Sequence, residues 1–452
     1  MLYFMIPPLC KGRPEGVVFL VNIKKGKKMK VLVIGSGGRE HALVWKISKS
    51  PLVEKVYCAP GNAGIADIAD IVDLSASDIG GLAKFVKREA IDLTVVGPEV
   101  PLTMGIVDHF EKENLRIFGP SRAAAELEGS KDFTKGIMKK YNVPTAAYES
   151  FTSKEEALAY IDKTGAPIVI KADGLAAGKG VVVAQTLDEA KEAVEAMMGD
   201  KAFGAAGEKV VIEEFMAGEE ASYLVFSDGK NILPMPTSQD HKAVFDGDKG
   251  PNTGGMGAYS PAPVVTGELE KRIVKEIIKP LVDGMAKEGK PYKGILYAGL
   301  MITKEGPRVV EFNCRFGDPE CQPIMMRMKG DVIPILEAVI DGNLDTVKME
   351  WDDRKTVCIV MAAGGYPGSY EKGKVIEGLD AFKGRDDLVV FHAGTAERDG
   401  EIVTSGGRVL GVTALGDGLD EAINTAYDAV RSISWDGVYF RNDIGKKGLA
   451  RL

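Results

Sequence analysis

The chain has 452 residues, of which 45% are hydrophobic and 27% charged, and its formal net charge is −8. A chain of this length is typical of about three domains, and its acidic balance excludes a general attraction to nucleic acid or to an anionic membrane. The five cysteines are scattered without a C-x-x-C pair and the four histidines are far apart, which excludes a disulfide framework and a His/Cys zinc site and favours a reducing cytoplasm.

The first 28 residues differ in character from the rest of the chain. Their apolar run is short, is broken by Pro7 and Pro8, and has no basic residue before it, which argues against a secretory signal. No apolar stretch of the chain approaches the ~20 residues that a membrane helix needs. We therefore interpret residues 1–28 as an extension that is disordered or not native, with Met29 as the start of the folded protein, and we expect no membrane partner.

Strands and helices alternate over residues 29–129. The pattern predicts strands at 30–34, 55–59 and 93–96, with helices at 40–49 and 79–89. This alternation is typical of a parallel α/β domain, whose ligand loops lie at the carboxyl ends of the strands.

The loop Gly35-Ser36-Gly37-Gly38 lies between such a strand and its helix. Its backbone N–H groups could hold a phosphate or a sugar, which makes Gly37 and Gly38 candidate substrate ligands, and a tight turn that only packs the helix is an equal alternative. A dinucleotide-dependent oxidoreductase is a further alternative. It is disfavoured because Glu40 stands where the fingerprint has its third glycine.

The region 130–350 contains a second predicted unit. We expect a helix at 131–141 and a small lid at about 150–213 with strands at 168–171, 181–184 and 210–215. A helix at 268–287 and strands at 299–303 and 308–312 follow.

A glycine-rich loop joins two strands of the predicted lid. Lys171 ends the first strand, and Gly174, Gly178, Lys179 and Gly180 follow. The glycine spacing and the lack of a Ser or Thr after Lys179 exclude a Walker P-loop. A hairpin that closes over ATP phosphates, with Lys171 as a point charge, is the favoured interpretation, and a mobile surface loop is the alternative.

Two apolar strands of this region end in polar residues. The first ends in Glu213-Glu214-Phe215-Met216 and continues to Glu220, which suits either an adenine and ribose site or a solvated acidic turn. The second contains Glu311 and Asn313, which share a face because strand side chains alternate. Such an oxygen pair suits Mg²⁺, and Arg315 continues the same face, where it could neutralise a transferred phosphate. A salt-bridged strand end is the alternative.

The last section, 351–452, is predicted to be a mixed β domain with strands at 356–361, 389–392 and 408–414 and a helix at 420–433. Segment 238–242 is polar and segment 251–257 is rich in glycine. An active-site segment and an ordinary loop are the two interpretations of this composition. The predicted fold class is therefore α/β and α+β multidomain.

Many motifs in this order resemble the phosphoribosylamine–glycine ligase (glycinamide ribonucleotide synthetase) family of the ATP-grasp superfamily. The resemblance runs from Met29 nearly to the end and rests on VLVIGSGGREHAL, APGNAG, VGPEVPL, GPSRAAAELEGSKDFTK, IVIKADGLAAGKGV, VIEEFMAGEEAS, TSQDHKAV, GPNTGGMGAYSP, YAGLMI, VVEFNCRFGDPE, MAAGGYPG and SGGRVLGVTALG. It implies an N-terminal α/β domain (29–129), an ATP-grasp domain with a lid (130–350) and a C-terminal domain (351–452).

The resemblance also implies the reaction. ATP, glycine and 5-phosphoribosylamine would give ADP, phosphate and glycinamide ribonucleotide through glycyl phosphate, in purine biosynthesis, with Mg²⁺ or Mn²⁺ as cofactor. We expect a cytoplasmic monomer whose partners are these small molecules.

The roles that the resemblance implies are assigned residue by residue. ATP would be bound by Lys131, Lys171, Gly178, Lys179, Gly180, Glu213, Glu214, Phe215, Met216 and Glu220, and the metal by Glu311 and Asn313. Arg315 would stabilise the acyl phosphate and Asp318 would hold the attacking amine. The ribose phosphate substrate would contact Gly37, Gly38, Glu99 and Arg408.

One departure concerns the metal. Many ATP-grasp enzymes carry a second acid on the preceding strand, and here residues 297–302 contain none. This leaves the number of metal ions open. A ligase for another acid or amine and a non-catalytic nucleotide-binding protein are the remaining alternatives.

Overall fold

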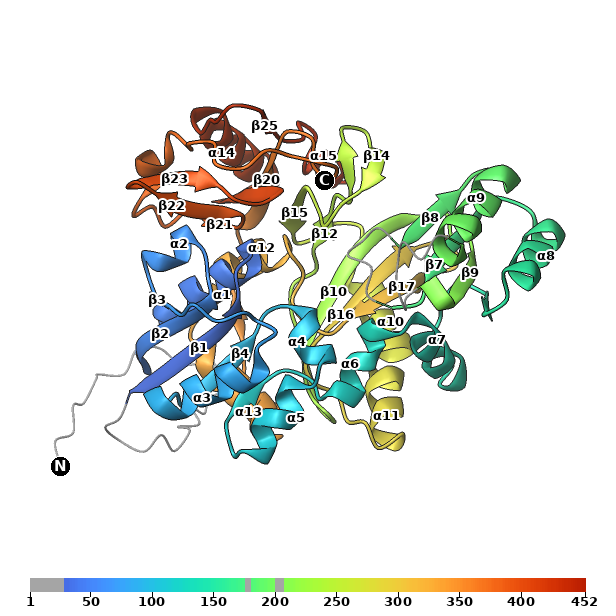
Figure 1. Cartoon of the computed structure of the whole chain (residues 1–452), viewed down its shortest axis with the longest axis horizontal. Helices are drawn as coiled ribbons and strands as arrows, with labels where there is room; N and C mark the ends of the chain where they lie inside the picture. The colour runs from blue at the N-terminus through green and yellow to red at the C-terminus, as the bar shows by residue number, and fades with distance from the viewer. Residues whose placement is uncertain (1–27, 175–179, 200–206) are drawn as a thin grey trace, which may run out of the picture.

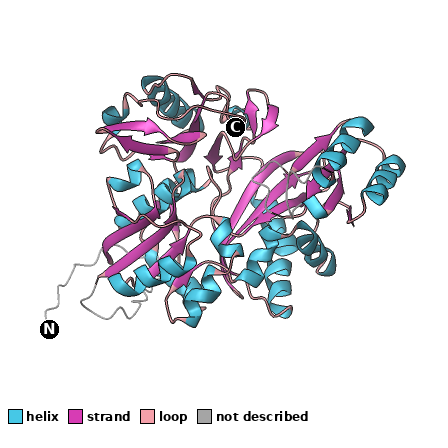
Figure 2. Cartoon of the chain, viewed as in Figure 1, coloured by secondary structure: helices cyan, strands magenta, loops and turns pink. Residues whose placement is uncertain are grey.

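A computed structural model describes residues 28–174, 180–199 and 207–452 of the chain (Figure 1). Two expectations concern residues outside these ranges. One is the interpretation of the extension 1–28, of which only Lys28 is described, and the other is the role expected of Gly178 and Lys179. Helices and strands are present throughout the described ranges, as Figure 2 shows. Among the described helices, none is both long and apolar enough to cross a membrane.

The N-terminal part is a five-stranded parallel sheet with the order β3-β2-β1-β4-β5. Its strands are β1 (Met29–Gly35), β2 (Val53–Pro60), β3 (Asp70–Ile71), β4 (Leu93–Val96) and β5 (Ile117–Phe118). The helices that connect them are α1 (Gly38–Ser48), α2 (Ala63–Ala66), α3 (Ile79–Glu89), α4 (Glu99–Thr103) and α5 (Ile106–Lys112). The strand order reverses between β1 and β4, so the loops after these two strands open at the switch point where such sheets bind ligands.

Local signals explain where several of these helices begin. The side chain of Asp78 accepts from the N–H of Gly81 at the start of α3, and Asn62 accepts from Ile65 at the start of α2. Each satisfies an N–H that the first turn of a helix leaves free. Helices α6 (Arg122–Gly129) and α7 (Lys131–Lys140) then lead out of the sheet, and Ser130 caps α7 by accepting from Phe133.

The lid is a four-stranded antiparallel sheet of order β6-β9-β7-β8 with two helices. Its elements are β6 (Tyr148–Phe151), α8 (Lys154–Thr164), β7 (Ile168–Ala172), β8 (Val181–Ala184), α9 (Leu187–Met198) and β9 (Val210–Glu214). In Figure 1 it projects at the far side of the molecule from the N-terminal sheet.

A second antiparallel sheet, of order β11-β10-β16-β17, forms the floor beside the lid. Its strands are β10 (Glu219–Asp228), β11 (Ile232–Pro234), β16 (Lys293–Ile302) and β17 (Pro307–Asn313). The helices of this region are α10 (Gly267–Ile273), α11 (Lys279–Lys287), α12 (Cys321–Arg327) and α13 (Ile333–Asp341). The short strands β18 (Met328–Lys329) and β19 (Glu350–Trp351) pair with each other, and a 3₁₀ turn, η3 (Leu344–Thr346), lies between α13 and β19.

The helix expected at 268–287 differs in one respect from the prediction. A π-helical segment, η2 (Val274–Ile278), separates α10 from α11. It ends two residues before Pro280, which lacks the N–H that a regular α-helix needs at that position.

The C-terminal sheet has the order β12-β15-β20-β24-β21, and every pair in it is antiparallel. Its strands are β12 (Gln239–Asp240), β15 (Gly257–Ser260), β20 (Lys355–Ala363), β21 (Leu388–His392) and β24 (Arg408–Gly416), and β25 (Val438–Tyr439) pairs with β20. Around it lie the hairpins β13 (Ala243–Phe245) with β14 (Lys249–Asn252) and β22 (Thr395–Arg398) with β23 (Glu401–Thr404), the 3₁₀ turn η4 (Leu379–Phe382), and helices α14 (Leu419–Ser432) and α15 (Lys446–Leu449). Segments 239–240 and 257–260 therefore join this sheet although they precede it by about a hundred residues in the chain.

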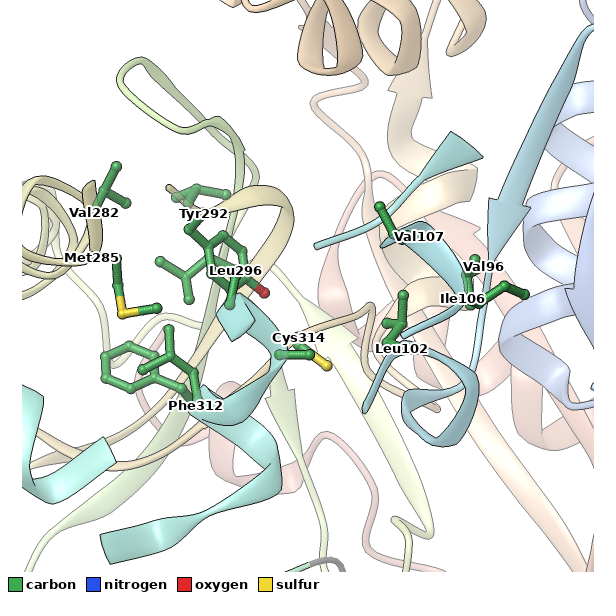
Figure 3. Close-up of a cluster of buried hydrophobic side chains, with 14 of the residues drawn as sticks. Val96, Leu102, Ile106, Val107, Val282, Met285, Tyr292, Leu296, Phe312 and Cys314 are labelled. Atoms are coloured by element: carbon green, nitrogen blue, oxygen red, sulfur yellow. The ribbon is translucent and has the colours of Figure 1, made fainter. Parts of the chain in front are cut away.

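One hydrophobic core spans the N-terminal sheet and the floor sheet. Figure 3 shows Val96, Leu102 and Ile106 of the first unit near Leu296 and Cys314 of the second, and all five are buried. Because these residues share one core, the two sheets pack on each other, and this packing brings the loops after β1 and β4 close to the end of β17.

Candidate active site

The end of β17 is the centre of the polar site. Glu311 pairs with Gly299 and Asn313 with Tyr297 of β16, so the two side chains share a face as predicted. A register shift opposite Gly299 and Leu300 leaves Val310 without a partner residue on β16. The strand ends at Asn313, so the alternation that places Glu311 and Asn313 together does not extend to Arg315.

Glu311 lies among cations. Its carboxylate is 3.4 Å from Nζ of Lys242, which comes from the segment after β12. Lys242 and, more weakly, Lys171 and Lys131 lower the pKa of Glu311 to about 2, although burial opposes them. The carboxylate is therefore ionised at neutral pH and able to act as a ligand for a hard cation.

The fit of a divalent cation rests on Glu311 and Asn313. Both supply oxygen donors, and phosphates and water would complete the shell, as is usual for Mg²⁺. Opposite Glu311 stands Gly299, where an added Cβ would lie 3.1 Å from Cγ of Glu311. The residues that the structure describes contain no group of three His, Cys, Asp or Glu with metal-binding geometry.

Two further carboxylates lie nearby without completing such a group. Glu220, on β10, is 3.3 Å from Nζ of Lys242, so this lysine bridges it to Glu311. Burial raises the pKa of Asp240 well above its ordinary range, and the neighbouring acids Glu320 and Glu220 add to this effect.

The predicted phosphate-binding lysines converge on this strand from the lid and from α7. Lys171 donates to the carbonyl of Val310 at 3.0 Å and is 2.9 Å from Oε1 of Glu213. Lys131 donates to the carbonyl of Gly174 at 2.8 Å, and burial lowers its pKa. The ammonium of Lys131 therefore contacts the start of the lid loop, and at the other end of the loop the carbonyl of Gly180 accepts from the N–H of Ala172.

The predicted adenine segment has three different environments. Glu213 is buried between two lysines and Met216 is also buried, whereas Phe215 is 41% exposed. The carboxylate of Glu214 accepts from the N–H of Ala147 at 3.1 Å and pairs with Arg308, so it ties β9 to β17.

Arg315 faces the N-terminal sheet. Its Nε donates to Glu99 at 3.2 Å, and its Nη2 donates to Glu128 at 2.7 Å. Glu99 is the first residue of α4, the helix after β4, so Arg315 contacts the switch point of the parallel sheet. Burial raises the pKa of Glu128, while Arg315 acts in the opposite direction.

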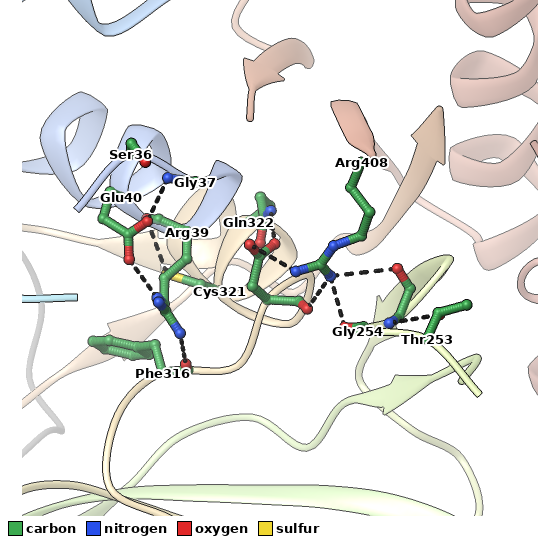
Figure 4. A network of polar contacts seen from close by, with 12 residues as sticks. Ser36, Gly37, Arg39, Glu40, Thr253, Gly254, Phe316, Cys321, Gln322 and Arg408 are labelled. Carbon is green, nitrogen blue, oxygen red and sulfur yellow. Dashed lines mark hydrogen bonds and ion pairs between the residues drawn. The ribbon is translucent and has the colours of Figure 1, made fainter. Parts of the chain in front are cut away.

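Asp318 and Arg408 form an ion pair, which joins the segment after β17 to the C-terminal sheet. Nη2 of Arg408 is 3.2 Å from Oδ2 of Asp318, and Nη1 donates to the carbonyl of Gly254 at 2.6 Å (Figure 4). Burial opposes ionisation of Asp318, but Arg408 and Arg39 lower its pKa overall. Asp318 is thus an ionised hydrogen-bond acceptor.

The first glycine loop packs directly against this pair. A Cβ on Gly37 would lie 3.1 Å from Oδ2 of Asp318, and a Cβ on Gly38 would lie 2.5 Å from Nε2 of Gln322. The structure therefore brings together Gly37, Gly38, Asp318 and Arg408, which the sequence predicted as separate motifs.

Two charged residues to which the sequence assigned no site role, Arg39 and Glu40, complete the loop. Glu40 accepts from the N–H of Gly37 at 2.6 Å and from Nε of Arg39 at 2.6 Å, and Nη1 of Arg39 donates to the carbonyl of Phe316 (Figure 4). A Cβ on Gly97 would lie 2.1 Å from Oε1 of Glu40. Glu40 thus joins the loops after β1 and β4, and it occupies one N–H of the loop.

Four other residues of the site were not predicted, namely Lys135, Glu128, Lys242 and Gln322. Lys242 lies in the polar segment 238–242, which carries no spacing that distinguishes a site from a loop. Lys135 follows Lys131 by one helical turn, so its position on the same helix face was a usable signal. Glu128 gave none, because its partner Arg315 is 187 residues away in the chain. Gln322 donates to Asp318, only four residues before it, but its close approach to Gly38 depends on the tertiary fold.

The sequence of the chain matches known protein families over most of its length. Three family profiles match: phosphoribosylglycinamide synthetase N domain at residues 29–128, its ATP-grasp (A) domain at 129–321, and its C domain at 356–447. The phosphoribosylamine–glycine ligase of Vibrio parahaemolyticus is 58% identical over 426 residues, which cover 94% of this chain and 99% of the relative. That of Escherichia coli is 58% identical over 427 residues, with the same coverage.

Two solved structures are similar to this chain in fold. The crystal structure of phosphoribosylamine–glycine ligase from Thermotoga maritima matches with a TM-score of 0.79 at 34% identity, over 92% of this chain and 100% of the other. A biotin carboxylase from Campylobacter jejuni matches with a TM-score of 0.71 at 15% identity, over 94% of this chain and 99% of the other, which is a likeness of fold alone.

Proposed function

The chain belongs to the phosphoribosylamine–glycine ligase family, and we infer from this membership and from the site that it is an ATP-dependent ligase that joins glycine to 5-phosphoribosylamine in purine biosynthesis. The similarity to these two relatives extends over 99% of the length of each. We propose in addition a role for each site residue, an acyl phosphate intermediate, a divalent metal and a state of assembly.

One observation carries the assignment of the site. The short segment from Val310 to Asp318 accepts from the lid's Lys171 at one end, through the carbonyl of Val310, and reaches the switch point of the N-terminal sheet at the other, through Arg315 and Glu99. A ligase that activates an acid with ATP and then passes it to a sugar amine needs both partners at one place. The end of β17 offers that place.

On the nucleotide side, Lys131, Lys171 and Gly180 would contact the phosphates of ATP, together with Gly178 and Lys179. Residues 213–216 would read the adenine, and Glu220 would accept from the ribose hydroxyls. Mg²⁺ or Mn²⁺ held by Glu311 and Asn313 would neutralise charge on the phosphate oxygens.

In the first step, a carboxylate oxygen of glycine attacks the γ-phosphorus and the bond to the β-phosphate oxygen breaks, which gives glycyl phosphate and ADP. The chain's contribution is to position the two anions and to screen their charge. Arg315 would stabilise the acyl phosphate. It is already held by Glu99 and Glu128, so little reorganisation is needed when charge develops nearby.

In the second step, the amine of phosphoribosylamine attacks the acyl carbon, the bond from that carbon to the phosphate oxygen breaks, and the proton that the nitrogen loses passes to the departing phosphate. Asp318 would accept a hydrogen bond from this amine, because Arg408 and Arg39 keep its carboxylate ionised. Gly37, Gly38, Glu99 and Arg408 would hold the ribose phosphate.

We also propose domain bounds of 29–129, 130–350 and 351–452, a monomeric state and a cytoplasmic location. Light scattering after size exclusion tests the second point, because a monomer has a mass of 48.4 kDa.

The test of the function is ADP release from ATP and Mg²⁺, with glycine and with phosphoribosylamine generated in place. Release that needs both substrates and yields glycinamide ribonucleotide supports the proposal. Release with a different acid or amine would reject the substrate assignment and keep the ATP-dependent ligase.

A further inference from the structure

Lys135 is a buried cation to which the proposed mechanism gives no role. It lies on α7, and its side chain is 3% exposed. Its Nζ is 3.0 Å from Oε2 of Glu213 and donates to Oγ1 of Thr145 at 2.9 Å. Thr145 in turn donates to the carbonyl of Val309 on β17, so the lysine is fixed from behind by the floor sheet.

The two oxygens of Glu213 are shared between two lysines. Oε2 faces Lys135, and Oε1 is 2.9 Å from Nζ of Lys171, whose side chain is 6% exposed. These three residues form a row from α7 through β9 to β7, which we call the Lys135–Glu213–Lys171 row. It contains two cations and one anion, and all three side chains are buried.

Taken alone, the row carries one surplus positive charge out of contact with water, and Glu311 on β17 lies near enough for Lys171 to help lower its pKa. A buried charge without a matching counter-charge is unfavourable, and an anionic ligand relieves that cost. Lys171 is the member that also reaches β17 beside Glu311, through the carbonyl of Val310. The surplus charge is therefore available at the end where a nucleotide phosphate would lie.

We propose that Lys135 is a positioning residue for nucleotide binding, which neutralises Glu213 from one side so that the ammonium of Lys171 keeps its charge for the phosphates. The inference rests on the proposed assignment of Lys171 to ATP. Without Lys135, Glu213 would have Lys171 as its sole cationic partner in the row, and the row would become neutral.

The experiment is calorimetric titration of the full chain with ADP, which binds without turnover. Two variants remove the charge: Lys135→Met, and Lys135→Gln, whose amide still donates to Glu213. Both should weaken ADP binding about tenfold or more, because a buried charge–charge term near the phosphates is lost. The matched control is Lys139→Met, an exposed lysine of the same helix, which should stay within about twofold of the wild type.

A double variant separates charge from structure. Lys135→Met with Glu213→Gln removes one cation and one anion, so the row again has one surplus positive charge on Lys171. Because residues 213–216 are themselves proposed to contact the adenine, the reference for the double variant is Glu213→Gln alone. Adding Lys135→Met to Glu213→Gln should change ADP affinity by less than about threefold, whereas a merely structural role for Lys135 predicts the same loss as in the wild-type background. Thermal unfolding of each variant reports its folded state.

Two results would overturn the inference: ADP affinity within twofold of the wild type in both Lys135 variants, or a double variant that binds ADP as much more weakly than Glu213→Gln as Lys135→Met binds it than the wild type. Failure of the proposed function gives a different result, because the wild type would then release no ADP with glycine and phosphoribosylamine. If Lys135→Met does not fold, the Gln variant decides the first point and its pairing with Glu213→Gln decides the second.

Discussion

Replacing Glu311 by glutamine removes one negative charge and keeps the shape of the side chain. Lowering the pKa of Glu311 from 4.5 to about 2 corresponds to roughly 3 kcal/mol of interaction with the surrounding cations. The side chain is 40% exposed, so solvent screening reduces its effect on the free energy of unfolding to about 1–2 kcal/mol. The variant should therefore fold, with a modestly lower stability.

Turnover should suffer much more than stability. Glu311 is one of two proposed metal ligands and an ion-pair partner of Lys242, so its loss leaves the transferred phosphate without its cation and misplaces a lysine. We expect the rate of ADP release with saturating glycine and phosphoribosylamine to fall by about 10²–10³. Raising Mg²⁺ should restore part of this loss, because the variant binds the ion more weakly.

The assay compares Glu311→Gln with Glu350→Gln, an exposed acid on β19, by coupled ADP release and by thermal unfolding. The control should keep wild-type turnover and stability. A Glu311→Gln enzyme with wild-type turnover at all Mg²⁺ concentrations would refute the metal assignment. An unfolded variant would refute the screening argument instead.

Other parts of the molecule lead to three further expected outcomes. Lys171→Ala should raise the KM for ATP at least tenfold with little change in the KM for glycine, and an unchanged ATP dependence in steady-state kinetics would remove its proposed role. Gly38→Ala should lower kcat/KM for phosphoribosylamine about tenfold or more, because its Cβ would lie 2.5 Å from Nε2 of Gln322; equal kcat/KM values would contradict this close packing. Burial lowers the pKa of His41 to about 3 and that of His392 to about 4, so both are neutral when folded but protonate below their ordinary value of 6.5 when unfolded. The free energy of unfolding should then fall by about 1.4 kcal/mol per pH unit for each histidine as pH drops from 6.5 towards 4, and denaturant titrations that show no steeper loss in the wild type than in His41→Asn would count against it.

Local pattern was a good guide to the longer elements. The strands expected at 30–34, 93–96 and 181–184 and the helix expected at 79–89 all occur, because continuous apolar runs and amphipathic spacing determine these elements locally. The two-residue strands β3 and β5 were not predicted, since so short a segment carries no period of its own. Their positions depend on pairing with β2 and β4.

The sequence by itself determined the family, the order of the units and the shared face of Glu311 and Asn313, because strand alternation places residues two apart on one face. Only the tertiary structure decided the ion pairs. Arg315 meets Glu99 and Glu128, which are 216 and 187 residues away in the chain, and Lys135 meets Glu213 across the lid boundary. Such partners follow from how the sheets pack around a common core, and no local period records them. The direction in which a charged side chain of the site points is therefore a property of the assembled fold.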